Sequence, residues 1–167
     1  MSLQHLITEL VEFNCWANGL YLDWLAPQPD EVLAREIQSS CPSIIKTLKH
    51  IWEAQEYWYG VVAETEDFVR VWEIEDPTRA MICVGLGSNS LKLAEFVKTL
   101  SDDDLSKRLR IDNDWLNCEL RKYEYLQQVV HHATYHRGQI VTMAHNLGIS
   151  GAPATDFLIR ATRIDPT

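Results

Sequence analysis

Residues 122–147 read KYEYLQQVVHHATYHRGQIVTMAHNL, and Gly148 follows them. Apolar residues recur along this stretch at the three- and four-residue steps of an α-helix. A glycine after the last periodic residue is typical of a helix end. The stretch therefore predicts a long helix whose apolar face is turned to the interior of a helical bundle. The residues on that face include Tyr125, Val129, Ile140 and Met143.

Two histidines, His132 and His136, lie on the same face, because positions four apart stack on one side of a helix. Buried imidazoles need partners, and either a metal ion or hydrogen bonds to carboxylates or carbonyls would supply them. An H-x-x-x-H pair alone is a weak signal for a metal. A third histidine strengthens it, and His50 is well placed within a second long predicted helix. His131 is rotated by about 100° from His132 and cannot easily share the same point.

The same periodicity predicts further helices on either side of the pair. We expect them at about residues 3–25, 43–63 and 89–100, with a short terminal helix at 155–163. Residues 64–88 predict a long connection, because they include acidic residues, Pro77 and two glycines. From residue 105 to 120 the periodicity moves toward two, which indicates a small β-hairpin. The chain is thus expected to be an all-α protein with one minor hairpin.

Composition limits the classes of partner. The chain has 167 residues, of which 46% are hydrophobic and 23% charged, which predicts one domain across residues 1–167. The formal net charge of −9 repels phosphate backbones and anionic lipid headgroups, so we expect neither nucleic acid nor a membrane as a partner. The four cysteines form no C-x-x-C pair, and we expect no secretory signal in residues 1–25, because His5, Glu9 and Glu12 interrupt the apolar positions there. We therefore expect free thiols and a cytoplasmic location.

Four segments match one family in the family's own order. On these segments the sequence resembles the DinB/YfiT-like superfamily, a group of small proteins regarded as metalloenzymes. The segments are FNCWAN at 13–18, SIIKTLKHI at 43–51, HATYHRGQI at 132–140 and TDFL at 155–158. The resemblance implies an up-down-down-up four-helix bundle, usually a homodimer, with a three-histidine metal site. The ligands that it implies are His50, His132 and His136.

Three neutral imidazoles would leave a divalent ion its full charge and an open coordination position. Zinc and nickel are the expected metals, because imidazole suits both. A bound water could become a nucleophile, or a substrate thiol could bind as a thiolate. The expected activity is therefore that of a thiol S-transferase-like enzyme or a hydrolase acting on a small molecule, with a low-molecular-weight thiol as one candidate. The alternative is a non-catalytic metal-binding stress-response module.

Three residues beside the implied ligands have their own interpretations. Glu53 could supply a carboxylate ligand, but we interpret it as a solvated charge or a partner of a ligand. His131 stands where relatives often carry asparagine, and we interpret it as a helix-surface residue. Arg137 is expected to pair with an acidic residue such as Asp156.

Overall fold

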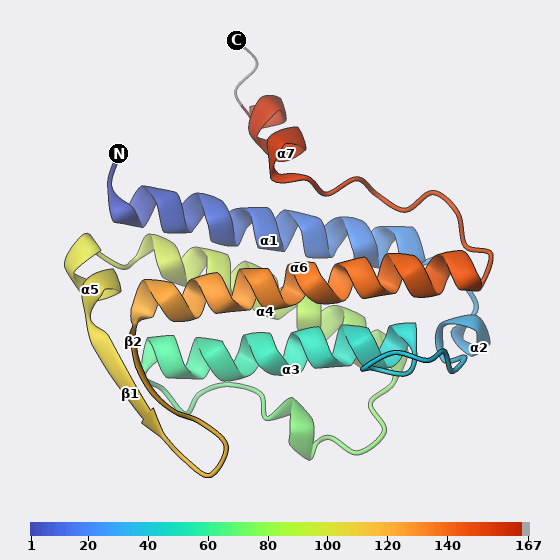
Figure 1. Ribbon diagram of the computed structural model, residues 1–167, viewed down its shortest axis with the longest axis horizontal. Helices are drawn as coiled ribbons and strands as arrows, with labels where there is room; N and C mark the ends of the chain where they lie inside the picture. Colours follow the sequence, from blue (N-terminus) through green and yellow to red (C-terminus); the bar gives the residue numbers. More distant parts are fainter. Residues whose placement is uncertain (165–167) are drawn as a thin grey trace.

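Four long helices form the body of the computed structural model, which describes residues 1–164 (Figure 1). They are α1 (Leu3–Leu25), α3 (Ile44–Ala63), α4 (Arg79–Lys98) and α6 (Lys122–Asn146). Helices α1 and α6 run in one direction and α3 and α4 in the other. Helix α1 contacts α4 and α6, and α3 contacts the same two helices. The all-α bundle expected from the sequence is confirmed.

Shorter elements connect the long helices, and one more follows the last of them. The connecting elements are α2 (Asp30–Leu33), the 3-10 helix η1 (Val71–Glu73), α5 (Asp102–Ser106), and strands β1 (Arg108–Asp112) and β2 (Asn117–Arg121). Helix α7 (Phe157–Ile164) follows α6. The predicted hairpin is confirmed as an antiparallel pair, and the predicted terminal helix is confirmed with a start two residues later than expected. The sequence patterns predicted neither α2 nor α5.

The expected bounds of the third long helix were wrong at the N-terminal side. Helix α4 starts at Arg79, ten residues before the expected start at 89, so the connection after α3 ends at Thr78. The Thr78 side chain accepts a hydrogen bond from the Met81 N–H and caps the helix. The glycines that indicated a loop lie inside the helix. Gly85 is required there, because a Cβ atom would overlap the ring of Trp52 on α3.

The interior consists of two hydrophobic clusters separated by polar side chains in the middle of the bundle. All four long helices contribute to these side chains, which we call the central polar layer: Asn14, Asn18, Gln55, Asn89, Ser90 and Arg137. The guanidinium of Arg137 donates to Asn14 Oδ1 at 2.8 Å and to Asn18 Oδ1 at 2.7 Å. The expected pairing with Asp156 was therefore wrong, since amide oxygens rather than a carboxylate receive this buried cation.

Among the described helices, α4 alone is long and apolar enough to cross a membrane on length and composition. Its buried residues, however, contact α1 and α3 inside the bundle. A helix in the core of a bundle meets the same criterion of length and composition.

Candidate metal centre

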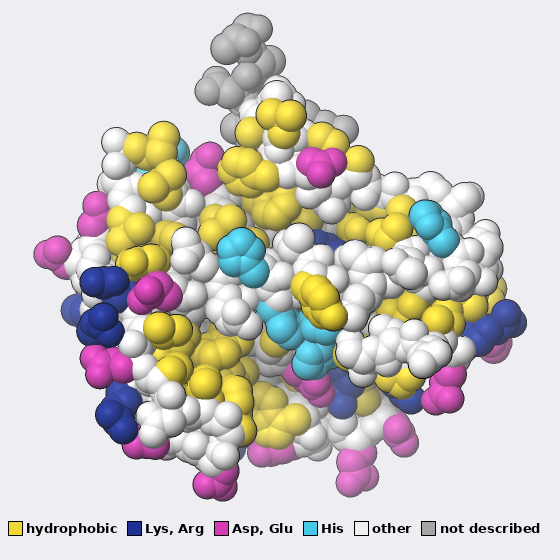
Figure 2. Space-filling model, in the orientation of Figure 1, with side chains coloured by type: hydrophobic (Ala, Val, Ile, Leu, Met, Phe, Trp, Pro, Cys, Tyr) yellow, Lys and Arg dark blue, Asp and Glu magenta, His cyan; other side chains and the backbone are white. Residues whose placement is uncertain are grey.

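Three histidine rings converge between α3 and α6. His50 comes from α3, and His132 and His136 come from successive turns of α6. The ring centroids lie 4.9 Å apart for His50 and His132, 4.7 Å for His50 and His136, and 4.4 Å for His132 and His136. In Figure 2, histidine side chains gather near the middle of the face formed by these helices. The structure thus brings together all three residues that the sequence singled out.

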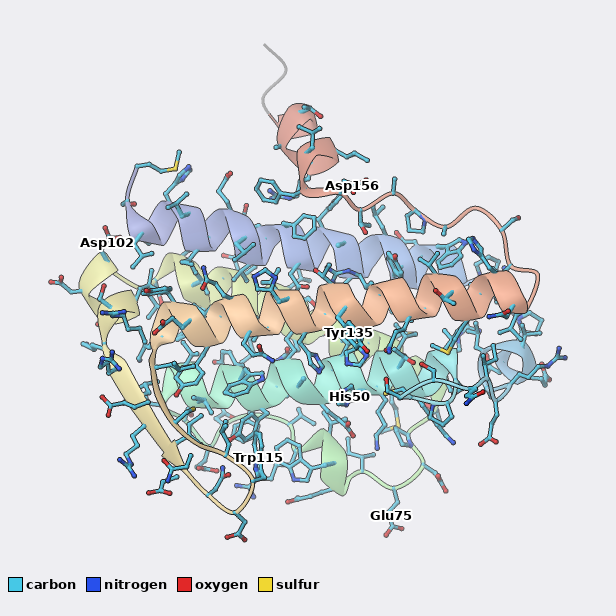
Figure 3. All side chains as sticks on the ribbon, in the orientation of Figure 1. His50, Glu75, Asp102, Trp115, Tyr135 and Asp156 are labelled. Atoms are coloured by element: carbon cyan, nitrogen blue, oxygen red, sulfur yellow. The ribbon has the colours of Figure 1, made fainter. Side chains whose placement is uncertain are left out.

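Helix geometry determines the position of each histidine ring. Ser43 caps α3 by accepting the Lys46 N–H at 3.2 Å, so His50 lies about two turns inside a regular helix. The spacing of four on α6 stacks the other two rings. Figure 3 shows His50 directed from α3 toward α6, with Tyr135 on α6 beside it.

Polar neighbours on the Nδ1 side favour Nε2 as the nitrogen that His136 and His50 present. His136 Nδ1 donates to Gln139 Oε1 at 2.7 Å, which leaves the lone pair on Nε2. His50 Nδ1 lies 3.6 Å from a carboxylate oxygen of Glu53. The Nε2 atoms of His50 and His132 are 3.2 Å apart. Tetrahedral ligands placed at the Zn–N bond length are separated by about 3.3 Å, so this distance suits two ligands of one ion.

Burial favours the neutral form of the two imidazoles on α6. Burial, together with the neighbouring His136 and His50 rings, lowers the pKa of His132 to about 4. Burial also lowers the pKa of His136, with His50 acting in the same direction and the hydrogen bond to Gln139 opposing it. Neutral imidazole is the form that binds metal. The rings therefore form a set of donors whose lone pairs suit a cation.

Cys41 is a further candidate ligand, and the sequence patterns did not find it. Its sulfur and the ring nitrogens of His50 and His136 all lie within 4.8 Å of one another. It lies in the loop before α3, and burial raises the pKa of its thiol. No motif spacing relates Cys41 to the histidines, because the path of this loop brings them together. The expectation of a free thiol nevertheless holds for all four cysteines.

A cavity of about 570 Å³ opens beside His50 and His132. Its aromatic walls come from α3, η1 and the hairpin, and the tryptophan at the hairpin tip is labelled in Figure 3. Glu53 is the one charged residue other than histidine in the lining, and Lys49 pairs with it at 3.2 Å. The volume suits a small-molecule ligand. The aromatic lining residues are Tyr57, Trp58, Trp72 and Trp115.

The structure also places His131 and Glu53, the two other residues near the implied ligands. His131 is exposed and is not part of the histidine cluster, as expected of a helix-surface residue. Glu53 lies against His50 and Lys49 and is only partly exposed, which fits a partner of a ligand rather than a solvated charge. The contributions of Trp72 and Trp115 to the cavity were missed, because both lie in segments whose sequence has no strong periodicity.

Comparison with known proteins adds two findings. The sequence model of the DinB family matches residues 1–163. Protein DinB from Bacillus subtilis (strain 168) is 31% identical over 155 residues, which cover 89% of this chain and 90% of that protein. The matched region includes His50, His132, His136 and all four long helices.

Proposed function

The chain belongs to the DinB family, and from that premise we propose that it is a metal-dependent enzyme whose ion is held by His50, His132 and His136. The observation that supports this most is the convergence of three imidazoles, two of them with lowered pKa values, at the edge of an aromatic cavity. Zinc or nickel is the proposed metal, since neutral nitrogen ligands suit both.

The proposed substrate is a small molecule in the aromatic cavity, and a low-molecular-weight thiol is one candidate. A bound divalent ion would supply a Lewis acid that favours the ionised form of a water or a thiol. The protein would orient His136 through Gln139, and His50 through Glu53. Tyr57, whose pKa is raised by burial, would keep its hydroxyl protonated at the cavity wall. The reaction would be thiol S-transfer or hydrolysis.

Metal analysis of purified protein tests the centre. One equivalent of zinc or nickel per chain is expected after reconstitution, and His132→Ala should lose it. His131→Ala is the matched control, because it removes a neighbouring exposed histidine from the same helix. Wild-type protein that retains no ion after reconstitution would exclude the proposal. Unchanged affinity in His132→Ala would exclude that residue as a ligand.

Substrate panels distinguish the two reactions. Metal-loaded and metal-stripped protein would be assayed with thiols plus electrophiles and, separately, with esters and amides. Turnover that is lost on stripping and restored by metal supports an enzyme, and the active panel identifies the reaction class.

The alternative function, a non-catalytic metal-binding stress-response module, has one observation in its favour. The Cys41 sulfur lies within 4.8 Å of ring nitrogens of His50 and His136, and together with His132 these residues would make a set of four protein ligands, which is typical of structural sites. A protein of this kind would gain stability from the metal yet turn over no substrate in either panel.

We also propose a homodimer in the cytoplasm, as the resemblance to the family implies. Sedimentation equilibrium measures the oligomeric state directly, and a mass near that of one chain would exclude the homodimer.

A further inference from the structure

Cys41 is held in a defined position next to the histidines. Gln139 Nε2 donates to the Ser40 hydroxyl at 3.0 Å, so α6 fixes the residue before it. On its other side, the Pro42 carbonyl accepts the Ile37 N–H at 2.9 Å, and buried Ser43 caps α3. The thiol therefore lies between two anchored points of the loop. Gln139 also receives the His136 hydrogen bond, so one side chain positions both the ring and the loop.

We propose that the Cys41 thiolate is the fourth protein ligand of the ion, which converts the resting centre from three nitrogens to three nitrogens and one sulfur. This inference rests on the proposed function, since it requires the three-histidine ion. The sulfur lies at most 4.8 Å from the nitrogens of His50 and His136. Ligands at the Zn–N and Zn–S bond lengths are separated by about 3.5 Å in a tetrahedron. A side-chain adjustment of roughly an ångström would close the difference.

The charge balance at the centre favours this ligand. Three neutral imidazoles leave the ion with its full double charge in a partly buried site. Glu53 lies on the Nδ1 side of His50 and already pairs with Lys49. Within the described histidine cluster, Cys41 is the one side chain that can become an anion. On binding, the thiol would release its proton to solvent as the metal–sulfur bond forms, and the net charge of the centre would fall by one.

The cavity and the Cys41 thiol both lie beside His50, but each lies beside a different histidine of α6. The cavity is lined by His50 and His132, whereas Cys41 groups with His50 and His136. A thiolate ligand would thus complete a resting centre of four protein ligands without occupying the substrate cavity, and a substrate would reach the ion from the cavity side as a fifth ligand. It would also make the centre more selective for metals that accept sulfur, such as zinc, cobalt and nickel.

Cobalt absorption tests the proposal without an activity assay. Metal-free protein would be titrated with Co²⁺, whose thiolate complexes have intense charge-transfer absorption in the near ultraviolet. Wild type should show this band at one equivalent. Cys41→Ser should bind Co²⁺ without the band, while Cys83→Ser should retain it. Cys83 is a suitable control because it is another half-buried thiol, on α4 beside Arg79 and away from the histidines.

The outcomes separate this inference from the proposed function. Failure of wild type to bind Co²⁺ would overturn both. Stoichiometric binding without a thiolate band, or a band that persists in Cys41→Ser, would overturn the Cys41 ligand and leave the three-histidine centre intact. If Cys41→Ser does not fold, alkylation of wild type gives the answer. Zinc should protect Cys41 from iodoacetamide as detected by peptide mass spectrometry, and equal labelling with and without zinc would contradict the proposal.

Discussion

Gln139 is not a ligand of the candidate centre, but it positions a residue that is, the imidazole of His136. Its amide oxygen accepts from His136 Nδ1, and its amide nitrogen donates to the Ser40 and Tyr135 hydroxyls at 3.0 and 3.1 Å. These contacts fix the tautomer of the ring as well as its direction. Residues of this kind affect metal binding even though they do not touch the ion.

Replacing Gln139 by Leu is therefore expected to weaken metal affinity by about 10- to 100-fold, the range typical of lost ligand-orienting hydrogen bonds. Competition with a chromophoric chelator would measure the change. His131→Asn is the control and should bind as wild type does, because that residue is exposed outside the cluster. Wild-type affinity in Gln139→Leu would show that the ring needs no such support.

Arg137 is a second residue whose role follows from burial. Only 2% of Arg137 is exposed, and its guanidinium lies over the ring of Phe13. Burial lowers the pKa of the guanidinium to about 10. Arg137→Met keeps an unbranched apolar stem but removes the guanidinium, which leaves the oxygens of Asn14 and Asn18 without their donor. We expect a loss of about 3 kcal/mol or more in the free energy of unfolding. Urea denaturation would measure this loss, and Arg137→Lys should have a stability between those of wild type and Arg137→Met. A loss below about 1 kcal/mol in Arg137→Met would contradict the reasoning.

Individual residues differ in how well the sequence alone could predict their place in the site. Helical spacing placed His132 and His136 on one face, and the family resemblance identified His50. Cys41 and Trp115 depend on the paths of a loop and a hairpin, which no periodicity encodes. The Arg137 partners were missed for a related reason, because the sequence cannot show that asparagines on α1 face a cation on α6.

At the scale of elements, the contact between α3 and α4 depends on one glycine. Gly85→Ala would force its new methyl group into the Trp52 ring, and we expect a loss of about 1–3 kcal/mol. Gly87→Ala is the matched control on the same helix, since its Cβ would lie 3.7 Å from the nearest Leu22 atom. That variant should gain about 0.5–1 kcal/mol from helix propensity. Thermal melts of the pair test the argument, and similar values for both would refute it.

Glu56 joins α3 to the connection that follows it. Its carboxylate accepts from Trp52 Nε1 at 3.1 Å and from the Val69 N–H at 3.3 Å. Burial raises the pKa of this carboxyl above its ordinary value of 4.5, and the hydrogen bonds from Trp52 and Val69 oppose that shift only in part. The folded state therefore favours the protonated form, so the contribution of Glu56 to stability is present below pH 4.5 and is lost as the pH rises through the folded pKa.

Glu56→Gln removes this titration. The stability of the variant relative to wild type should increase as the pH rises from about 4 to 7, because only wild type must bury a charge over that interval. Chemical denaturation of both proteins at several pH values would measure the difference in their free energies of unfolding. The titration of all other groups is common to both proteins and cancels in this difference. A difference that stays constant with pH would contradict the expected direction.

The elements themselves were predictable where one apolar face repeats without interruption. The expected bounds of α1, α3 and α6 agree with the structure to within one residue at each end. Helix α4 was shortened because Gly85 and Gly87 have the local signal of a loop, whereas their role is tertiary. Helix α5 was missed because Asp102, Asp103 and Asp104 interrupt the apolar pattern, yet acidic side chains in a first turn stabilise a helix start.

At the scale of the whole molecule, the candidate centre is continuous with the middle of the bundle. His136 precedes Arg137 on α6, and Arg137 is part of the central polar layer that all four long helices share. The layer separates the two hydrophobic clusters and so fixes the register in which the helices pack. A metal ion would add one more link at this level, between α3 and α6.

Metal binding should therefore stabilise the entire bundle. An ion that binds only the folded chain adds about 2.7 kcal/mol when its free concentration is 100 times Kd. For a chain of this length, that corresponds to a rise in Tm of roughly 5–10 °C. Calorimetry of wild type with zinc and with a chelator would measure the rise. His136→Ala should melt at the same temperature in both conditions, because it lacks one of the ligands that link the ion to α6. A wild-type Tm that does not change with zinc would mean that the three histidines bind no ion under those conditions, and that their side chains contribute to packing alone.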